Sequence, residues 1–175
     1  IADMLDNGTV MNGKMIESPK SFQVACIVTS QIIATVASNQ YGGQTISTAH
    51  LAPLVRKSYN KYYEKYKKRG IAEEQCVEYA TEDVLKEIEE SVQTIQYQLN
   101  TLMTTNGQAP FISIAMYLNE EPEYIKENAM LIEEILKQRY IGVKDEEGNY
   151  ISPAFPKLLY FLDETEKVDL LKKYM

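Results

Sequence analysis

The fold is decided by the stretch Phe111-Ile112-Ser113-Ile114-Ala115-Met116-Tyr117-Leu118. Apolar residues fill this run almost completely, and its length suits a strand better than a helix. A polar turn containing one glycine comes directly before it. We therefore predict that the run forms a strand buried inside a sheet.

A helix and a second apolar run follow this strand. Residues 121–140 are amphipathic and Gly142 lies just beyond them, which predicts a helix. After the polar turn 145–149 comes Leu158-Leu159-Tyr160-Phe161-Leu162, whose continuous apolar character favours a strand covered on both faces. Strand, helix and strand in succession predict parallel pairing through a right-handed crossover.

Upstream of this unit we expect helices around one short strand. The pair Ser18-Pro19 is typical of an N-cap and a first helical position, which predicts a helix that ends near Ser38. Residues 44–47 are expected to form the short strand. Leu51 begins a basic helix, and Gly70 stands where the residue after its last turn is expected.

A longer helix is predicted from Thr81, the candidate N-cap, to about Met103. Its apolar positions alternate in steps of three and four, the pattern of a helix that pairs along a narrow seam. These positions are Leu85, Ile88, Val92, Ile95, Leu99 and Leu102. A seam between two subunits and a seam within one core give the same pattern.

Composition restricts the class of protein. The 175 residues are 45% hydrophobic, which suits one domain with a real core. The net charge of -7 disfavours general nucleic-acid binding. Two cysteines and the absence of an apolar run near 18 residues argue against a disulfide scaffold and a membrane span, so we expect a cytoplasmic protein. Because the chain starts at Ile1, we expect a fragment.

Basic and aromatic residues are concentrated in one segment. Of the 18 Lys and Arg residues, seven lie in this segment: Arg56, Lys57, Lys61, Lys65, Lys67, Lys68 and Arg69. Tyrosines at positions 59, 62, 63 and 66 lie between them. Such a segment could hold a triphosphate and stack on a base. The alternative is a solvated helix face whose lysine stems lie along apolar surface.

Two polar turns share one chemistry. The first turn is Val36-Ala37-Ser38-Asn39-Gln40-Tyr41-Gly42-Gly43-Gln44-Thr45, and the second is Asn100-Thr101-Leu102-Met103-Thr104-Thr105-Asn106-Gly107-Gln108-Ala109-Pro110-Phe111. Each turn passes from an expected helix end through glycine and amide residues to an expected apolar strand. Amide and hydroxyl side chains both donate and accept hydrogen bonds. We interpret both turns as parts of a site; tight turn geometry is the alternative.

With Glu17-Ser18-Pro19-Lys20-Ser21 and Pro153-Ala154-Phe155-Pro156-Lys157-Leu158, in this order, these turns resemble the catalytic subunit of anaerobic (class III) ribonucleoside-triphosphate reductase, a glycyl radical enzyme. The resemblance runs from about Ile1 to Asp163. It implies a helix-rich α/β fold that forms about one half of a ten-stranded α/β barrel, with long helices suited to a dimer interface. Residues 17–104 would form the helical effector and dimer region, and 105–175 the strand-helix-strand barrel segment. An incomplete barrel predicts uncovered strand edges and self-association.

The resemblance also implies the chemistry. The whole enzyme would reduce ribonucleoside triphosphates to deoxyribonucleoside triphosphates, with a glycyl radical installed by an S-adenosylmethionine iron-sulfur activase, and with a structural zinc. The radical glycine and catalytic cysteines of the family have no match here, so we predict no catalytic residue, no metal and no activity for this chain alone. Cys26 is expected to pack in the core, Cys76 is expected to be structural or exposed, and His50 has no local partner for metal binding.

Binding residues follow from the same resemblance. The expected contacts to a deoxynucleoside triphosphate or ATP effector are Glu17, Lys20, Ser21, Gln31, Arg56, Lys57, Lys61 and Lys65. The expected contacts to the substrate nucleotide are Ser38, Asn39, Gln40, Tyr41, Gly42, Gly43, Asn106, Gly107 and Gln108. Helix capping is the alternative for the first three residues, and a satisfied core amide is the alternative for Gln31.

Two other functions stay open. One is a non-enzymatic helical module that dimerises through the long helix and binds an acidic partner, which leaves the polar turns unexplained. The other is a different glycyl radical enzyme, which fits these turns less well. Binding of deoxynucleotides is the observation that separates the reductase from both.

Overall fold

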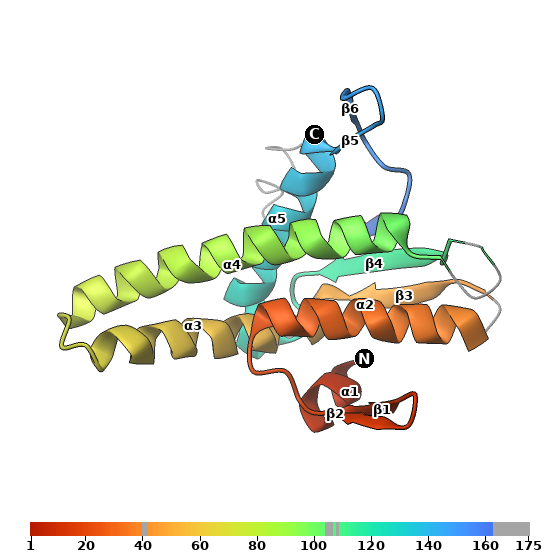
Figure 1. Cartoon of the computed structure of the whole chain (residues 1–175). Coiled ribbons are helices and arrows are strands. Elements are labelled where there is room, and N and C mark those ends of the chain that lie inside the picture. The colour runs from red at the N-terminus through yellow and green to blue at the C-terminus, as the bar shows by residue number, and fades with distance from the viewer. Residues whose placement is uncertain (40–41, 104–106, 108, 163–175) are drawn as a thin grey trace.

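The computed structural model describes residues 1–39, 42–103, 107 and 109–162. Figure 1 shows long helices packed beside a small sheet, with one hairpin at each end of the described chain. The elements in chain order are α1 Ala2–Asn7, β1 Thr9–Met11, β2 Lys14–Ile16, α2 Phe22–Asn39, β3 Gln44–Ser47, η1 Thr48–His50, α3 Ala52–Lys67, α4 Glu73–Thr101, β4 Ile112–Tyr117, η2 Pro122–Tyr124, α5 Ile125–Ile141, β5 Val143–Lys144, β6 Tyr150–Ile151 and β7 Lys157–Phe161.

The largest sheet confirms the predicted parallel unit. Its strand order is β3-β4-β7, and both neighbouring pairs are parallel. Ile114 of β4 stands opposite Ile46 of β3 on one side and opposite Leu158 of β7 on the other. Helix α5 carries the chain from β4 toward β7, as the strand-helix-strand pattern predicted.

Only one face of β7 is covered by the described residues. Alternate residues along the strand are half-buried and exposed, and the side chains of Leu159 and Phe161 are 43% and 49% exposed. The prediction of a strand covered on both faces is therefore wrong for β7. A parallel strand acquires two covered faces only when elements pack on each side, and α2, α4 and α5 lie on the side of Leu158.

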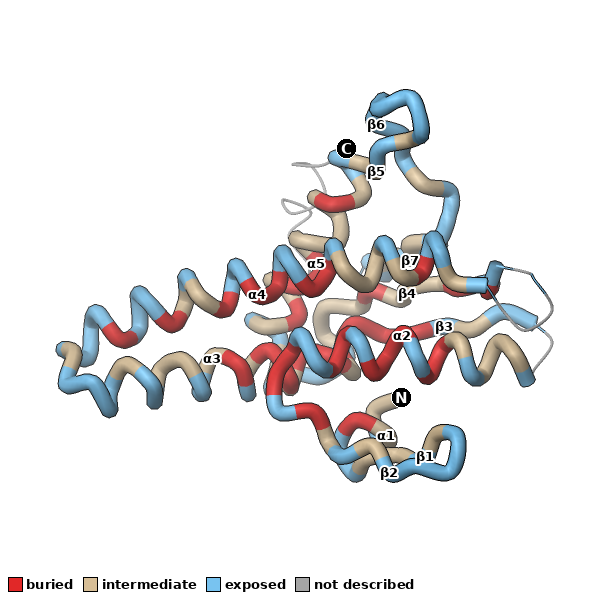
Figure 2. Tube along the Cα trace, in the orientation of Figure 1, coloured by how far each residue is buried: buried red, intermediate tan, exposed pale blue. Residues whose placement is uncertain are grey.

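The main core lies between the helices. Figure 2 shows buried residues where α2, α3, α4 and α5 face one another and the sheet. Phe22, Leu54 and Ile88 are among its largest fully buried side chains. Cys26 is buried in this cluster, which confirms its structural role, and Cys76 is buried too.

Two predicted helix starts are wrong. Helix α2 begins at Phe22 rather than after Ser18, because Ser21 supplies the cap: its Oγ accepts from the Val24 N–H at 3.4 Å. The Ser18 hydroxyl instead donates to the Leu5 carbonyl. Helix α4 begins at Glu73, and Thr81 lies inside it with its hydroxyl bonded to the Val77 carbonyl at 2.7 Å. Acidic residues in its first turn suit the helix dipole.

The alternating apolar stripe of α4 faces the core of its own chain. Ile88, Val92 and Leu99 are buried there, whereas Leu85 is 48% exposed. Most of the predicted seam therefore packs against α2 and α3.

Helix α2 is long and strongly apolar. Its 18 residues have a mean hydropathy of 1.3, which by length and composition would allow it to cross a membrane. The expected absence of an apolar run near 18 residues is therefore wrong for Phe22–Asn39. In the structure α2 contacts α3 and α4, and eight of its residues are buried, as in the core helix of a folded domain.

A buried carboxylate fixes the start of α2. Glu87 on α4 is 7% exposed and accepts from the Gln23 N–H at 3.0 Å and from the Ser58 hydroxyl at 3.1 Å. Ser58 on α3 in turn accepts from the Phe22 N–H at 2.8 Å. We call this contact between α2, α3 and α4 the α2 anchor. Ser21, Ser58 and Glu87 form it. It satisfies backbone donors that a helix start otherwise leaves unpaired.

We predict that Glu87→Ala lowers the free energy of unfolding by about 2–3 kcal/mol, because it leaves the buried Ser58 hydroxyl and the Gln23 N–H without their acceptor and removes hydrogen bonds to a charged group. Glu90→Ala is the control, since Glu90 is exposed and its ion pair with Lys86, at 3.9 Å, lies on the surface; it should cost about 0.5 kcal/mol or less. Urea unfolding measures both. Equal effects of the two substitutions would contradict the anchor.

A second prediction concerns the β5–β6 hairpin. Gly142 and Gly148 both have positive φ, 81° and 85°, but a Cβ on Gly142 would lie 2.4 Å from the Ile151 carbonyl oxygen, whereas a Cβ on Gly148 meets no described atom within 4 Å. Gly148→Ala should cost about 1–2 kcal/mol for conformation alone. Gly142→Ala should lower the free energy of unfolding further, because the backbone at Ile151 must also move. Thermal unfolding of the two variants checks the order, and equal melting temperatures would contradict it.

Candidate functional site

The described ends of the two polar turns, residues 42–44 and 109–111, lie at one edge of the sheet. Each turn precedes a strand, and β3 and β4 are parallel neighbours, so both turns reach the amino edge together. The Gln44 N–H donates to the Phe111 carbonyl at 2.8 Å, which joins the strand starts. The Gln44 side chain also donates to the Ile33 carbonyl at 3.1 Å, which attaches this edge to α2.

The structure describes part of the predicted substrate set. Ser38 and Asn39 form the end of α2, where the Asn39 amide donates to the Thr35 carbonyl at 2.8 Å. Gly42, Gly43 and Gly107 are exposed at the amino edge. The other predicted substrate contacts lie outside the described residues: Gln40, Tyr41, Asn106 and Gln108.

Backbone geometry also explains why glycines occupy these positions in the two turns. Gly42 and Gly107 have φ of 114° and 72°, in the region that side chains other than glycine rarely adopt. Gly43 lies against β4, since a Cβ there would be 3.7 Å from the Phe111 carbonyl oxygen. Turn geometry therefore accounts for Gly42 and Gly107, and it leaves their N–H groups at an exposed surface.

The predicted effector residues gather partly at the α2 anchor. Glu17 and Lys20 are exposed just before α2, and Ser21 is the buried cap. The Phe22–Ser58 hydrogen bond places this segment against the middle of α3. Lys57 precedes Ser58, and Lys61 lies about one turn further on the same exposed flank.

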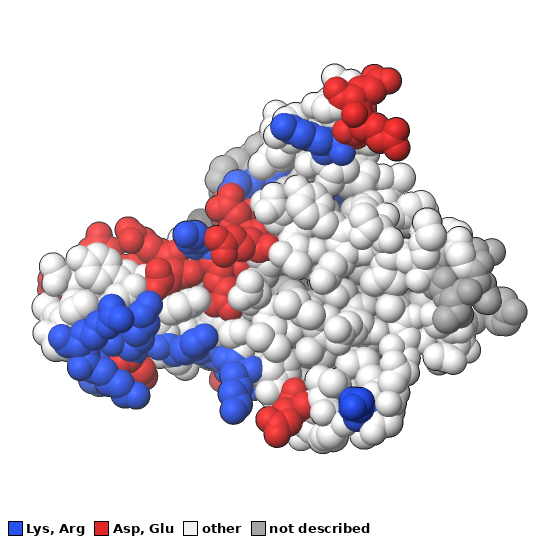
Figure 3. All heavy atoms as spheres, in the orientation of Figure 1, with Lys and Arg blue, Asp and Glu red and all other residues white. Residues whose placement is uncertain are grey.

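The first turn of α2 is not an open anion site. Its N–H groups at Phe22, Gln23 and Val24 already donate to Ser58, Glu87 and Ser21. The positive charge that would attract an anion to this surface must therefore come from lysine side chains. Figure 3 shows Lys and Arg side chains in a band along α3, next to acidic side chains of neighbouring elements.

Arg56 has other partners. Its guanidinium forms a bidentate pair with Glu127 on α5, at 2.8 and 2.9 Å, and lies 4.4 Å from the centre of the Tyr124 ring. A third bond reaches the Glu123 carbonyl oxygen at 2.6 Å. Burial raises the pKa of Glu127, but hydrogen bonding to Arg56 outweighs this, and the pKa stays below its usual value. These contacts do not support the predicted phosphate contact of Arg56.

Lys65 and Gln31 lie away from the anchor. The Lys65 ammonium is 3.6 Å from the Asp83 carboxylate and 4.9 Å from the centre of the Tyr66 ring. Gln31 is exposed on α2, ten residues beyond Ser21 and so about 15 Å along the helix. Its side chain is exposed, so the core alternative is wrong. The eight predicted residues do not form one cluster.

Glu87 is the residue that sequence reasoning missed. An acid between Val84 and Ile88 on the apolar stripe of α4 was the available signal. Burial first, and the Glu87 carboxylate second, raise the pKa values of the Cys26 thiol and the Tyr62 phenol. Cys26 is therefore a weak nucleophile.

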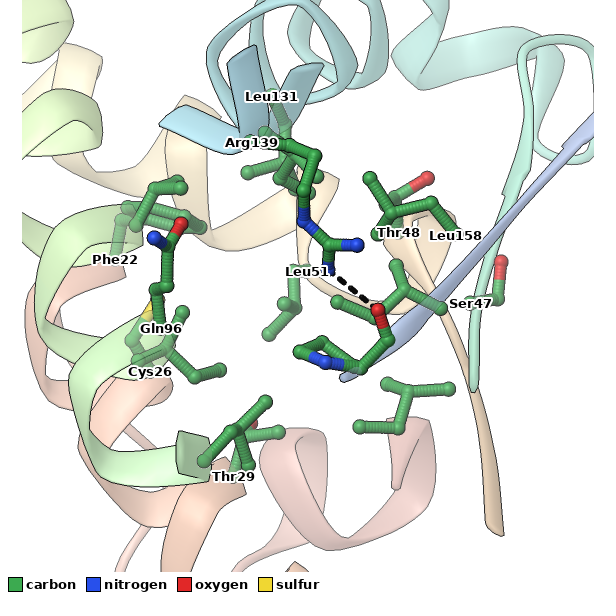
Figure 4. A pocket seen from close by; sticks show the side chains of 17 residues that line it. Phe22, Cys26, Thr29, Ser47, Thr48, Leu51, Gln96, Leu131, Arg139 and Leu158 are labelled. Atoms are coloured by element: carbon green, nitrogen blue, oxygen red, sulfur yellow. Dashed lines mark hydrogen bonds between the residues drawn. The ribbon is translucent and has the colours of Figure 1, made fainter. Parts of the chain in front are cut away.

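A cavity of about 40 Å³ lies between the sheet and the helices (Figure 4). Helices α2, α4 and α5 and the strands β3, β4 and β7 supply its walls, which are mostly apolar. Arg139 of α5 reaches into it and donates to the Pro156 carbonyl oxygen. Nothing in the sequence analysis singled out this residue. Within the described ranges, no three His, Cys, Asp or Glu side chains could share a metal ion.

Comparison with known proteins gives one consistent result. The family described as anaerobic ribonucleoside-triphosphate reductase matches residues 1–174. The chain is 37% identical over 163 residues to the anaerobic ribonucleoside-triphosphate reductase of Enterobacteria phage T4, covering 92% of this chain and 26% of that protein. It is 38% identical over 159 residues to the reductase of the same description from Escherichia coli (strain K12), covering 90% of this chain and 21% of that protein. The chain therefore belongs to the family of anaerobic ribonucleoside-triphosphate reductases.

Proposed function

We propose that this chain forms the effector region and one substrate wall of an enzyme that reduces ribonucleoside triphosphates to deoxyribonucleoside triphosphates. The chain spans 26% and 21% of the two relatives compared above. The observation that carries the proposal is the packing of α2: its start lies on the lysine-bearing α3, and its end leads into the polar amino edge of the sheet.

At the start of α2, Lys57 and Lys61 hold the phosphates of a deoxynucleoside triphosphate or ATP. Both are exposed on α3, and Glu17 and Lys20 are exposed just before α2. Lysine is a flexible point charge and suits a phosphate chain. Glu17 and Lys20 contact the base or ribose, while Ser21 stays committed to capping α2. Lys65 and Gln31 lie further away and extend this surface rather than complete it.

At the end of α2, the amino edge of β3 and β4 forms a wall for the substrate nucleotide. The exposed residues Gly42, Gly43 and Gly107, through their backbone, and the side chains of Ser38 and Asn39 would hydrogen-bond to ribose hydroxyls and phosphate. These groups bind and orient the nucleotide. The radical chemistry of the family, with its glycyl and thiyl radicals, is not assigned to any residue described here, and no step depends on Cys26 or Cys76.

Helix α2 links the two sites. Its 18 residues span about 27 Å, and hydrogen bonds attach its first turn and its second half: Gln23 to Glu87, and the Ile33 carbonyl to Gln44. Effector contacts that favour one position of α2 would therefore change the amino edge where the substrate lies. A rigid element with two attached ends is a physical route for such coupling.

The open face of the sheet supports assembly with further protein. Leu159, Phe161 and Phe111 are 43%, 49% and 61% exposed on the described surface. We propose that further strands of a barrel cover this face in the whole enzyme, that the enzyme is a homodimer, and that it requires a radical-activating partner. The structural zinc of the family has no fitting ligands among the described residues, since Cys26 and Cys76 lie in separate buried positions.

Isothermal titration with the four deoxynucleoside triphosphates tests the effector assignment. We expect at least one to bind, and Lys57→Gln with Lys61→Gln to weaken that binding by roughly tenfold or more, the loss expected for contacts to charged groups. Lys68→Gln is the control for each single variant: it removes one charge about 10 Å beyond Lys61, just after the end of α3. Light scattering reports the mass of each sample.

A folded chain that binds none of the four nucleotides would contradict the effector assignment and favour the helical interaction module. Equal losses from Lys68→Gln and from the Lys57 and Lys61 substitutions would show a general charge effect instead. Retained binding in the double variant would place the phosphates elsewhere.

A further inference from the structure

A groove of about 820 Å³ lies where α5 crosses α4. Residues 82–89 of α4 form one wall and residues 130–137 of α5 form the other. Figure 1 shows that the part of α4 before this crossing projects with α3 beyond the sheet. We call this space the α4–α5 groove. It is open along the outer side of the helices, and the described residues leave it uncovered.

The α4–α5 groove contains an exposed leucine. The side chain of Leu85 is 48% exposed, whereas Ile88 and Val92, which follow it on the alternating apolar stripe of α4, are 1% and 3% exposed. Met130 of α5 is half-buried and lines the same groove. Apolar residues in steps of three and four are typical of a helix that pairs with another helix. At Leu85 this stripe leaves the core of its own chain and reaches the surface.

Acidic side chains predominate around this leucine. The groove is lined by the carboxylates of Glu82, Glu89, Glu133 and Glu134 and by the ammonium groups of Lys86 and Lys137. Four negative and two positive charges leave a net charge of -2. Lys137 lies 3.4 Å from Glu89, and Lys86 lies 3.9 Å from Glu90, so both lysines already have acidic partners. Within the described ranges Glu82 forms no ion pair. Figure 3 shows acidic side chains gathered along α4 and near its crossing with α5.

We propose that the α4–α5 groove docks a partner protein through an amphipathic helix that carries lysine or arginine. Side chains of a third helix fit between the ridges of two crossing helices, and an amphipathic helix lies in such a groove with anchors at i, i+3 or i+4 and i+7. Apolar anchors of the partner pack on Leu85 and Met130. Its basic side chains pair with Glu82 and Glu89. The net negative charge attracts a basic helix and disfavours an acidic one.

The chemistry of the groove favours a separate protein over a further part of the same polypeptide. Surfaces that are buried permanently are strongly apolar, as is the open face of the sheet with Leu159 and Phe161. A surface that binds a partner reversibly has an apolar centre and a polar rim, which is the arrangement around Leu85. The groove includes none of the predicted effector or substrate residues. This inference therefore does not depend on the nucleotide sites proposed above.

Titration with a synthetic peptide tests the proposal. The probe is a fluorescein-labelled peptide of leucine and lysine, about 18 residues or five helical turns long, with leucines in steps of three and four. We expect saturable binding to the 175-residue chain by fluorescence anisotropy. A peptide of the same composition with leucines on all sides of the helix should bind about tenfold more weakly or worse. Amide NMR should place the shift changes at residues 82–89 and 130–137.

Two leucine variants locate the apolar contact. Leu85→Asn should weaken binding of the amphipathic peptide by about fivefold or more, because it removes the apolar centre of the groove. Leu159→Asn is the matched control: it changes a leucine that is 43% exposed on the open face of the sheet, and it should leave binding unchanged. Both leucines are exposed, so both variants should remain folded.

A pair of charge variants tests the rim. Glu82→Gln with Glu89→Gln should weaken peptide binding by about tenfold and reduce its dependence on salt, whereas Glu146→Gln with Glu147→Gln, two exposed changes before β6, should do neither. The proposal is overturned if the chain binds no peptide, or if both leucine arrangements bind equally, which would show attraction by net charge alone. Equal losses from the two leucine variants would place the peptide on the sheet and overturn it as well.

Discussion

The Glu87 carboxylate, buried where three helices meet, is the interaction on which the rest of the structure depends. It accepts from the Gln23 N–H and from the Ser58 hydroxyl, and Ser58 accepts from the Phe22 N–H. A buried charge is costly unless hydrogen bonds compensate it, and here Oε1 accepts from a donor that the helix start leaves free and from Ser58, while Oε2 is buried without a hydrogen-bond partner among the described residues. The charge and the helix start therefore stabilise each other, and α2, α3 and α4 are held in one arrangement.

The position of α2 determines what lies at each of its ends. Near its start, exposed residues before Phe22 lie beside the lysines of α3; near its end, the Ile33 carbonyl accepts from the Gln44 side chain at the amino edge of the sheet. One apolar helix thus separates and connects two polar surfaces. The same helix lines the Arg139 cavity with Cys26 and Thr29. A change in its position would therefore change both polar surfaces and the cavity.

Sequence predicted the elements whose signals are local. The apolar run at 111–118 became β4, the amphipathic stretch became α5, and β7 pairs with β4 in parallel as expected. Gly70, with φ of 76°, follows the end of α3. Those outcomes rest on periodicity and on glycine, which act over a few residues.

The predictions were wrong where residues that are far apart in the sequence determine the local structure. Ser18 and Ser21 are both plausible caps, and the choice of Ser21 depends on Ser58 and Glu87, which are far away in sequence. Thr81 lost its predicted role because α4 begins earlier, at Glu73. For the candidate site, the meeting of the two turns followed from parallel pairing, whereas the partners of Arg56 on α5 and the placement of Arg139 in a cavity depend on tertiary packing that no local pattern contains.

Hydrogen exchange of individual backbone amides tests the central claim, the fixed start of α2, most directly. If Glu87 and Ser58 hold this turn, the Phe22 and Gln23 amides should exchange as slowly as amides in the middle of α2, through near-global unfolding. Fast exchange of these two amides in a chain whose core amides remain protected would show that the start of α2 is frayed, and it would contradict the account of both the anchor and the sites arranged around it.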